Sequence, residues 1–257
     1  MSARRAIGWA VGLLLTISFS TSGNVLAQTP LTPAAGADAG QPGTTVHEPS
    51  APPLYDQTAH VGSNWSDSSD YGKSHGQLYG YLSNQAADDF VVPSSVFWKV
   101  VTATVDGQYV GVQGAGVDHL VVQIYANSGS NVPGNQLYSN TFAAASIINF
   151  ATGTYGVVFN PPVTLGPGHY WLSAQALEQC TASNCKHWVW LESTVLANSE
   201  SAWLQPTPAV GYNCPTWKPR VSSCHEPGSS SGPDLLFKLE GSSIPVRSQV
   251  FLPVVRR

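Results

Sequence analysis

The last third of the chain gathers aromatic side chains that could bind a ligand. Trp188 and Trp190 stand two residues apart, so on a β-strand they would share one face. Trp203, Tyr212 and Trp217 follow in the same region. If exposed, such rings would stack on a sugar or grip an apolar partner. The alternative is that they fill the core between two sheets, and we favour it because large aromatic residues are mostly buried.

The same region holds all four cysteines, which predict disulfides because an even number in an exported chain usually pairs. They stand at Cys180, Cys185, Cys214 and Cys224. Short loops close most readily, so we expect Cys180–Cys185 and Cys214–Cys224, each worth about 2–3 kcal/mol. The alternative is a zinc site, but these spacings do not match paired Cys-x-x-Cys ligands.

Acidic residues near both ends of the folded region offer a second kind of site. Calcium takes six to eight oxygen ligands and often joins the loops of secreted sandwiches. Asp88 and Asp234 are the candidate ligands, provided that the strands opening and closing the domain are neighbours. The alternative is that both carboxylates accept hydrogen bonds at strand starts. No other metal or cofactor is expected.

Motifs for catalysis are weak. Gly228-Ser229-Ser230-Ser231-Gly232 fits Gly-x-Ser-x-Gly, but no helix follows to form the nucleophile elbow. A glycosidase needs two carboxylates flanking the scissile bond, and no spacing among the glutamates singles out such a pair. We therefore predict a non-enzymatic protein, with a secreted glycoside hydrolase-like enzyme as the alternative.

The chain begins with a predicted export signal, which precedes the strands that would position these residues. Arg4 and Arg5 precede the apolar stretch 6–19, and Val25-Leu26-Ala27 supplies small residues where a signal peptidase reads. Residues 1–27 are therefore predicted to be a signal peptide, and the mature chain to be secreted, extracellular or at the cell surface. The apolar stretch is shorter than the roughly 20 residues of a spanning helix. No second one follows, so we expect no membrane span in the mature chain.

The charge balance argues against a nucleic-acid partner. Without Arg4 and Arg5, nine Lys and Arg face fifteen Asp and Glu, a net charge near −6. No basic cluster remains apart from Arg256-Arg257. Only 10% of residues are charged, whereas Gly and Pro are frequent, a composition that suits short strands and turns.

The pattern along the chain predicts one all-β domain. Residues 28–53 are rich in Pro, Ala, Gly and Thr and are expected to be a flexible leader. The polar stretch 62–76 is expected to be a long loop. From Ala87 onward, runs of period two bounded by turn residues predict about nine to eleven short strands. We expect an antiparallel two-sheet β-sandwich, jelly-roll-like, over residues 54–241.

Several of these strands also carry a resemblance. The segments are Ala87-Asp88-Asp89-Phe90, a hairpin over 122–138, Gly168-His169-Tyr170-Trp171, and the closing strand 234–241. Together they resemble a group of bacterial secreted β-sandwich domains with an A-D-D-F opening strand, a G-x-Y-W strand and a D-x-x-F-x-L-x-G closing strand. The resemblance implies a jelly-roll-like fold and no particular activity, since fold does not fix function.

The end of the chain differs in character from the domain. Residues 242–257 are expected to be a C-terminal tail, with 242–249 as a linker before Val250-Phe251-Leu252-Pro253-Val254-Val255. This segment is similar to short tails of exported bacterial proteins, which implies a sorting or attachment tag. The alternatives are an edge strand that docks back on the sandwich and a frayed end.

The function we expect is that of an extracellular binding or surface module. Carbohydrate is the expected ligand class, and an extracellular glycan or a cell-envelope component is the expected partner. A purely structural envelope component is a further alternative.

Overall fold

The structure is a computed structural model, and it describes residues 52–70, 83–111, 117–151, 153–178, 186–206, 214–226 and 232–246. Almost all regular structure within these ranges is β-strand, with a 3₁₀ turn at Ala144–Ser146 and a short π-type helix at Arg220–Cys224. None of the described helices is long and apolar enough to cross a membrane. Antiparallel sheets pack against each other, so the predicted all-β sandwich is confirmed.

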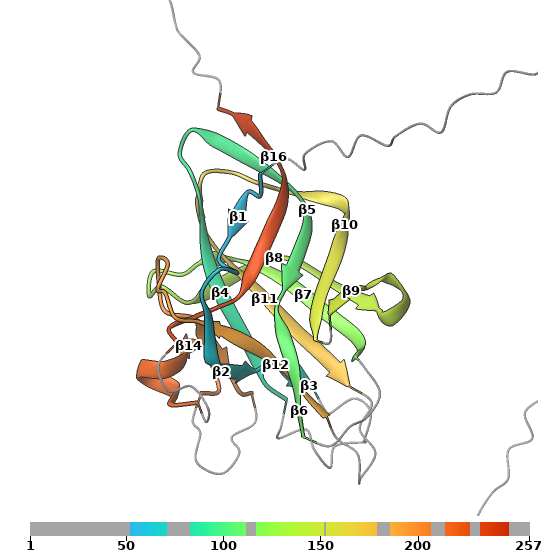
Figure 1. Ribbon diagram of the computed structural model, residues 1–257. Helices are drawn as coiled ribbons and strands as arrows, with labels where there is room; N and C mark the ends of the chain where they lie inside the picture. Colours follow the sequence, from blue (N-terminus) through green and yellow to red (C-terminus); the bar gives the residue numbers. More distant parts are fainter. Residues whose placement is uncertain are drawn as a thin grey trace, which may run out of the picture. The chain divides into compact units, whose positions relative to one another are not determined.

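The first sheet has five strands in the order β1-β16-β5-β10-β9 (Figure 1). Their bounds are Tyr55–Asp56 for β1, Phe237–Pro245 for β16, Val96–Val105 for β5, Thr154–Leu165 for β10 and Ile148–Ala151 for β9. Because β1 pairs with β16, the start and the end of the described chain lie side by side in this sheet.

The second sheet follows the order β14-β13-β4-β11-β7-β8. Its strands are β14 at Lys218–Pro219, β13 at Ala202–Leu204, β4 at Gln85–Val92, β11 at Gly168–Glu178, β7 at Val117–Asn127 and β8 at Pro133–Ala143. The short strand β3, Ser69–Asp70, also joins β11, and this pairing is parallel. The segments that carry the resemblance supply its central strands β4 and β11, which pair in register from Gly168–Val92 to Ser173–Ala87.

A smaller third sheet continues the first around a corner. Its central strand β12, Lys186–Ser193, pairs with β2 at Val61–Asp67, β6 at Gly107–Gly111 and β15 at Asp234–Leu235. At the corner, Asp106 N–H donates to the Leu236 carbonyl at 3.0 Å and Leu236 N–H to the Leu191 carbonyl at 2.9 Å. Two strands of the first sheet are thus continuous with the third sheet: β5 continues into β6, and β15 continues into β16.

The core lies between the facing sheets because alternate side chains of each strand point inward. Phe90 of β4 and Leu172 of β11 meet Phe237 of β16 and Phe159 of β10, all almost fully buried. The rings of Phe90 and Phe237 touch edge to face with centroids 6.2 Å apart. Each such side chain contributes about 1.5–3 kcal/mol when buried.

Two predictions about local structure were wrong. The stretch 61–67, expected to be part of a loop, forms β2. Its polar side chains find buried partners, and Ser66 is one such side chain. The sandwich also continues beyond Gly241, since β16 pairs with β5 as far as Pro245 opposite Val96. Residues 242–245 therefore belong to the domain and are not a linker.

Candidate functional site

Three of the candidate aromatic residues are core side chains. Trp188 and Trp190 are fully buried and Trp203 is 2% exposed, so the exposed platform is wrong for them and the core alternative is confirmed. Trp188 and Trp190 do share one face of β12, with ring centroids 6.3 Å apart. Their indole N–H groups donate to the carbonyls of Gly153 at 2.8 Å and Leu236 at 2.7 Å, which removes the cost of burying them.

The other two candidates lie elsewhere. Trp217 is half-buried and packs edge to face on Tyr125, with centroids 5.7 Å apart, on the outer face of the second sheet. It is therefore also no open platform. Tyr212 lies outside the described residues.

The disulfide prediction is confirmed for one pair. Cys214 and Cys224 are bonded, with Cα atoms 5.7 Å apart, which rules out zinc ligation by these two. Cys180 and Cys185 lie outside the described residues, and their pairing stays a prediction. The bond closes the segment that carries the short helix Arg220–Cys224.

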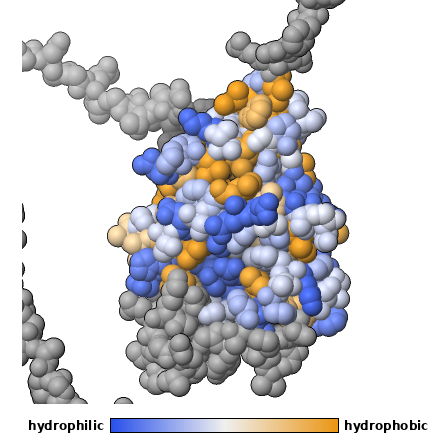
Figure 2. Space-filling model, turned by 180° about the vertical axis from the view of Figure 1, so that it is seen from behind, coloured by the Kyte–Doolittle hydropathy of each residue, from blue (hydrophilic) through white to orange (hydrophobic). Residues whose placement is uncertain are grey.

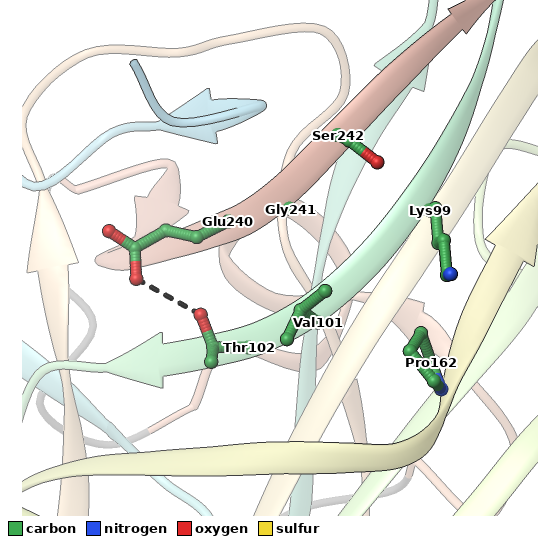
Figure 3. Close-up of a pocket in the computed structure, with 7 residues that line it drawn as sticks. All are labelled: Lys99, Val101, Thr102, Pro162, Glu240, Gly241 and Ser242. Atoms are coloured by element: carbon green, nitrogen blue, oxygen red, sulfur yellow. Dashed lines mark hydrogen bonds between the residues drawn. The ribbon is translucent and has the colours of Figure 1, made fainter. Parts of the chain in front are cut away.

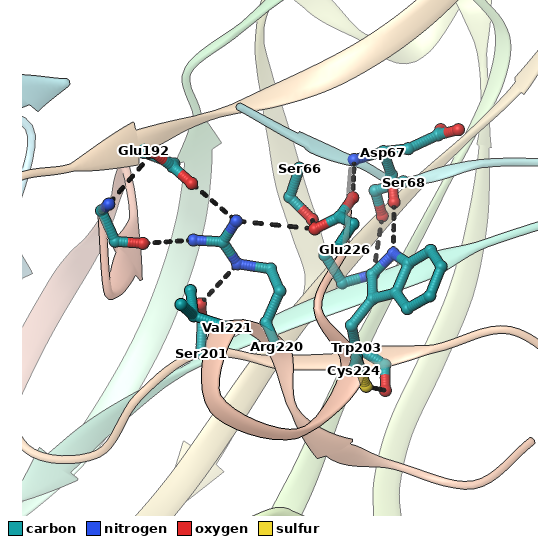
Figure 4. A network of polar contacts seen from close by, with 12 residues as sticks. Ser66, Asp67, Ser68, Glu192, Ser201, Trp203, Arg220, Val221, Cys224 and Glu226 are labelled. Carbon is teal, nitrogen blue, oxygen red and sulfur yellow. Dashed lines mark hydrogen bonds and ion pairs between the residues drawn. The ribbon is translucent and has the colours of Figure 1, made fainter. Parts of the chain in front are cut away.

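That helix places a fully buried arginine in a network of polar groups (Figure 4). Arg220 Nη1 lies 2.7 Å from Glu192 Oε1 and 3.5 Å from Glu226 Oε2. Its Nε donates to Ser201 Oγ at 2.9 Å, and its Nη2 donates to the Gly232 carbonyl. The network thus joins β12, β13 and the loop before β15 around one guanidinium group.

The far end of the network reaches β2. Glu226 accepts hydrogen bonds from Ser66 Oγ at 2.9 Å and from Asp67 N–H at 2.6 Å. Burial raises the pKa of Glu226 to about 8, outweighing the nearby Arg220 charge, which lowers it. Burial likewise raises the pKa of Asp67 to about 7. Glu192 and Glu226 are buried, whereas Asp67 is half-buried, and these groups join β2 to the loop that carries Arg220.

The calcium candidates do come close together, as the sequence predicted, but as hydrogen-bond acceptors. Asp88 Oδ2 accepts from Leu235 N–H at 2.6 Å and Gln57 Nε2 at 2.5 Å, and Asp88 Oδ1 accepts from Asp89 N–H at 2.9 Å. Asp234 Oδ2 accepts from Ala197 N–H at 2.5 Å. Burial raises the pKa of Asp234 to about 7, and burial together with the Asp234 charge raises that of Asp88.

This arrangement does not fit a calcium ion. N–H donors already occupy both oxygens of Asp88 and one oxygen of Asp234, whereas calcium needs six to eight oxygen ligands. Within the described ranges, no three His, Cys, Asp or Glu residues are grouped to hold a metal.

Beside this cluster, Asp89 and His169 form a pair at the rim of the second sheet. His169 Nε2 lies 2.5 Å from Asp89 Oδ2, and its ring stacks on Trp171 with centroids 5.9 Å apart. The side chain of His169 is 23% exposed and hydrogen-bonded to Asp89. Ser199 N–H also donates to Asp89 Oδ2, at 2.9 Å, which anchors the covering loop to the sheet.

The open hollow on the first sheet was not predicted. In β5, Thr102 pairs with Glu240 and Val158, whereas Val100 pairs with Gly241 and Val163. Val101 is thus a bulge against β16, and residues 159–162 of β10 are looped out opposite it on the other side. Bulges bend a sheet and re-aim its side chains. The bend leaves a hollow of about 540 Å³, here called the β5 crease (Figure 3). It is lined by Lys99, Val101, Thr102, Pro162, Glu240, Gly241 and Ser242.

The crease combines one fixed anion with one cation available for binding. Glu240 is held by Lys238 Nζ at 2.9 Å and by Thr102 Oγ1 at 3.0 Å, which keeps the pKa of its carboxyl low. Lys99 is exposed and makes no ion pair with any described residue. Gly241 is required at the floor, since a Cβ there would collide with the Lys99 carbonyl oxygen. The only sequence signal for the β5 crease was Gly241, a glycine inside a strand pattern.

The comparisons with known proteins identify no relative. Neither the family models, nor the curated proteins, nor the solved structures include a match to this chain.

Proposed function

We propose that this protein is a secreted, non-enzymatic binding module that holds carbohydrate in the β5 crease. The observation that carries the proposal is the unpaired ammonium group of Lys99 beside hydroxyl side chains over an apolar floor, all on an exposed sheet face. The predicted signal peptide and the disulfide Cys214–Cys224 support an extracellular place of action.

The lining suits the two-sided chemistry of a sugar. A pyranose ring offers C–H groups on its faces and hydroxyl groups at its edge. Val101 and Pro162 supply apolar contact, whereas Thr102 and Ser242 can exchange hydrogen bonds with hydroxyl groups. Lys99 can donate to a sugar hydroxyl or, more strongly, to the carboxylate of an acidic sugar.

Binding is favoured over hydrolysis because of the carboxylate arrangement. A glycosidase flanks the scissile bond with two carboxyl groups, one of them protonated, about 5–9.5 Å apart. Glu240 is the single carboxylate lining the described crease, and its lowered pKa keeps it ionised. The carboxyl groups of Asp88 and Glu226 are buried and accept structural hydrogen bonds.

The test is a glycan array followed by calorimetry on the mature protein. Lys99→Ala is expected to weaken binding about 10–100-fold, because a hydrogen bond from a charged group is worth about 1.5–3 kcal/mol. Lys99→Arg should retain most of the affinity. Ser139→Ala, on the exposed edge strand β8, is the control for surface changes remote from the crease.

Two outcomes would contradict the proposal. Failure of the wild-type protein to bind any neutral or acidic glycan would exclude carbohydrate as the ligand class. Binding that survives Lys99→Glu unchanged would place the ligand outside the crease.

A further inference from the structure

A second hollow lies across β16 from the β5 crease, at the end where the described chain begins and ends. Its volume is about 570 Å³ and its walls are largely apolar. The apolar lining residues are Pro52, Pro53, Leu54, Pro93, Val96 and Trp98. We call this feature the terminal hollow.

The strand beside the terminal hollow has one open edge. β16 pairs with β5 from Phe237 to Pro245, but β1 covers its other edge only at Lys238 and Leu239. Leu54 N–H adds one bond to the Leu239 carbonyl, and the preceding Pro52 and Pro53 have no N–H to donate. Within the described residues, the 241–245 part of this edge therefore has no strand partner.

The chain leaves the described domain at this same place. Val246 N–H donates to the Ser95 carbonyl at 2.8 Å, and Ser95 also lines the terminal hollow. Phe97, Ile244 and Val246 are 39%, 49% and 40% exposed there. Figure 2 shows hydrophobic residues near the top of the molecule, which is the end at which β16 finishes in Figure 1.

The residues that follow are suited to cover this surface. Residues 247–257 include the apolar run 250–255, which begins four residues after Val246. At about 3.3 Å per extended residue, four residues span roughly 13 Å, and hairpin loops commonly have two to five residues. Three of the nine basic residues of the predicted mature chain lie in 247–257, whereas all fifteen acidic residues precede it. The tail is thus drawn to the rest of the chain by charge as well.

We propose that the segment Val250–Val255 folds back as an edge strand on the open side of β16 and covers the terminal hollow. The apolar side chains of Val250, Phe251 and Leu252 then replace water over the exposed Ile244 and the proline-lined wall. Pro253 is compatible with this position, because an outer edge strand tolerates a residue without an N–H group.

Hydrogen exchange of the full mature chain tests the strand addition. The double variant Phe251→Asp/Leu252→Asp is expected to speed exchange of the Ser243 amide at least tenfold, because the odd-numbered residues of β16 point to the open edge, as Phe237 and Leu239 do, whereas Val246 points to β5. The matched control, Ser248→Asp/Gln249→Asp, adds the same two charges in the connecting loop and should leave exchange unchanged. Equal exchange in the wild type and in the Phe251→Asp/Leu252→Asp variant would overturn the proposal.

A photo-crosslinking benzophenone at position 251 identifies the occupant of the terminal hollow. Crosslinks within one molecule to peptides covering 52–54 or 93–98 are the expected result. Crosslinks solely between two molecules would show that a second copy covers the surface, and the absence of both products would show that the tail does not dock. Either result overturns the proposal without bearing on glycan binding.

Discussion

Replacing Arg220 by methionine should destabilise the domain strongly. The guanidinium group is fully buried, and it faces Glu192 at 2.7 Å and Glu226 at 3.5 Å, both also buried. Methionine roughly fills the volume, but it removes the cation that faces the two carboxyl groups and the N–H donors to Ser201 Oγ and the Gly232 carbonyl. Breaking a buried ion pair from one side typically costs about 3–5 kcal/mol.

The size of the effect makes it easy to measure. For a domain of this length, 1 kcal/mol shifts the melting temperature by about 2–4 °C, so a loss of about 6–20 °C is expected. Urea unfolding followed by tryptophan fluorescence and by circular dichroism gives the free energy directly. Lys99→Met is the matched control, since that cation is exposed, and it should change stability by less than about 0.5 kcal/mol.

A double-mutant cycle separates the ion pair from simple packing. If Arg220 acts through Glu192, the pair Arg220→Met/Glu192→Gln should cost less than the sum of the single variants, by about 0.5–3 kcal/mol. A loss below about 1 kcal/mol for Arg220→Met, or strict additivity in the cycle, would refute the claim that this charge compensates the buried carboxyl groups.

Three further predictions concern pH, the disulfide and the crease. Burial raises the pKa of Glu226 to about 8 and of Asp67 to about 7, so the folded protein binds these protons more tightly than the unfolded chain. The stability that these two groups contribute should be fully present below about pH 4 and be lost as pH rises towards 8. In the Glu226→Gln variant, the melting temperature should therefore depend less on pH across this range. Replacing Cys214 and Cys224 by serine should cost about 2–3 kcal/mol in urea unfolding, and a reductant should have the same effect. Gly241→Ala should cost about 1–3 kcal/mol, because the added Cβ meets backbone; unchanged melting would contradict the crease geometry.

The sequence predicts the strands with regular alternation best. β5, β7 and β11 repeat apolar residues every second position, which is the pattern that predicted the all-β sandwich. β2 escaped prediction because its residues are mostly polar. Ser66 is buried in β2 because it donates a hydrogen bond to Glu226. Glu226 lies far away in the sequence, so the local pattern of residues cannot predict this partner.

The same limit applies to the candidate sites. The period of two correctly placed Trp188 and Trp190 on one face, and the sequence favoured the core, yet which face is buried depends on how the sheets pack. Arg220 was not singled out, because its partners come from three separate segments. The β5 crease depends on Val101 and on residues 159–162 of β10, which fall outside the registers of β5 with two distant strands.

The way the two sheets are covered points to the β5 crease as the place for a ligand. On the second sheet, both faces of the central strands are covered: the inner face by the core, and the outer face by residues 197–206 and 214–220. There Trp171 and Ala202 are fully buried and Trp217 packs above them. The polar network around Arg220 and the disulfide fix this cover in place. No described residue forms such a layer on the outer face of the first sheet, since Lys99, Val158 and Ser242 remain exposed on three neighbouring strands. Because the described part of the late aromatic region covers the second sheet, we infer that a ligand would find open surface on the first.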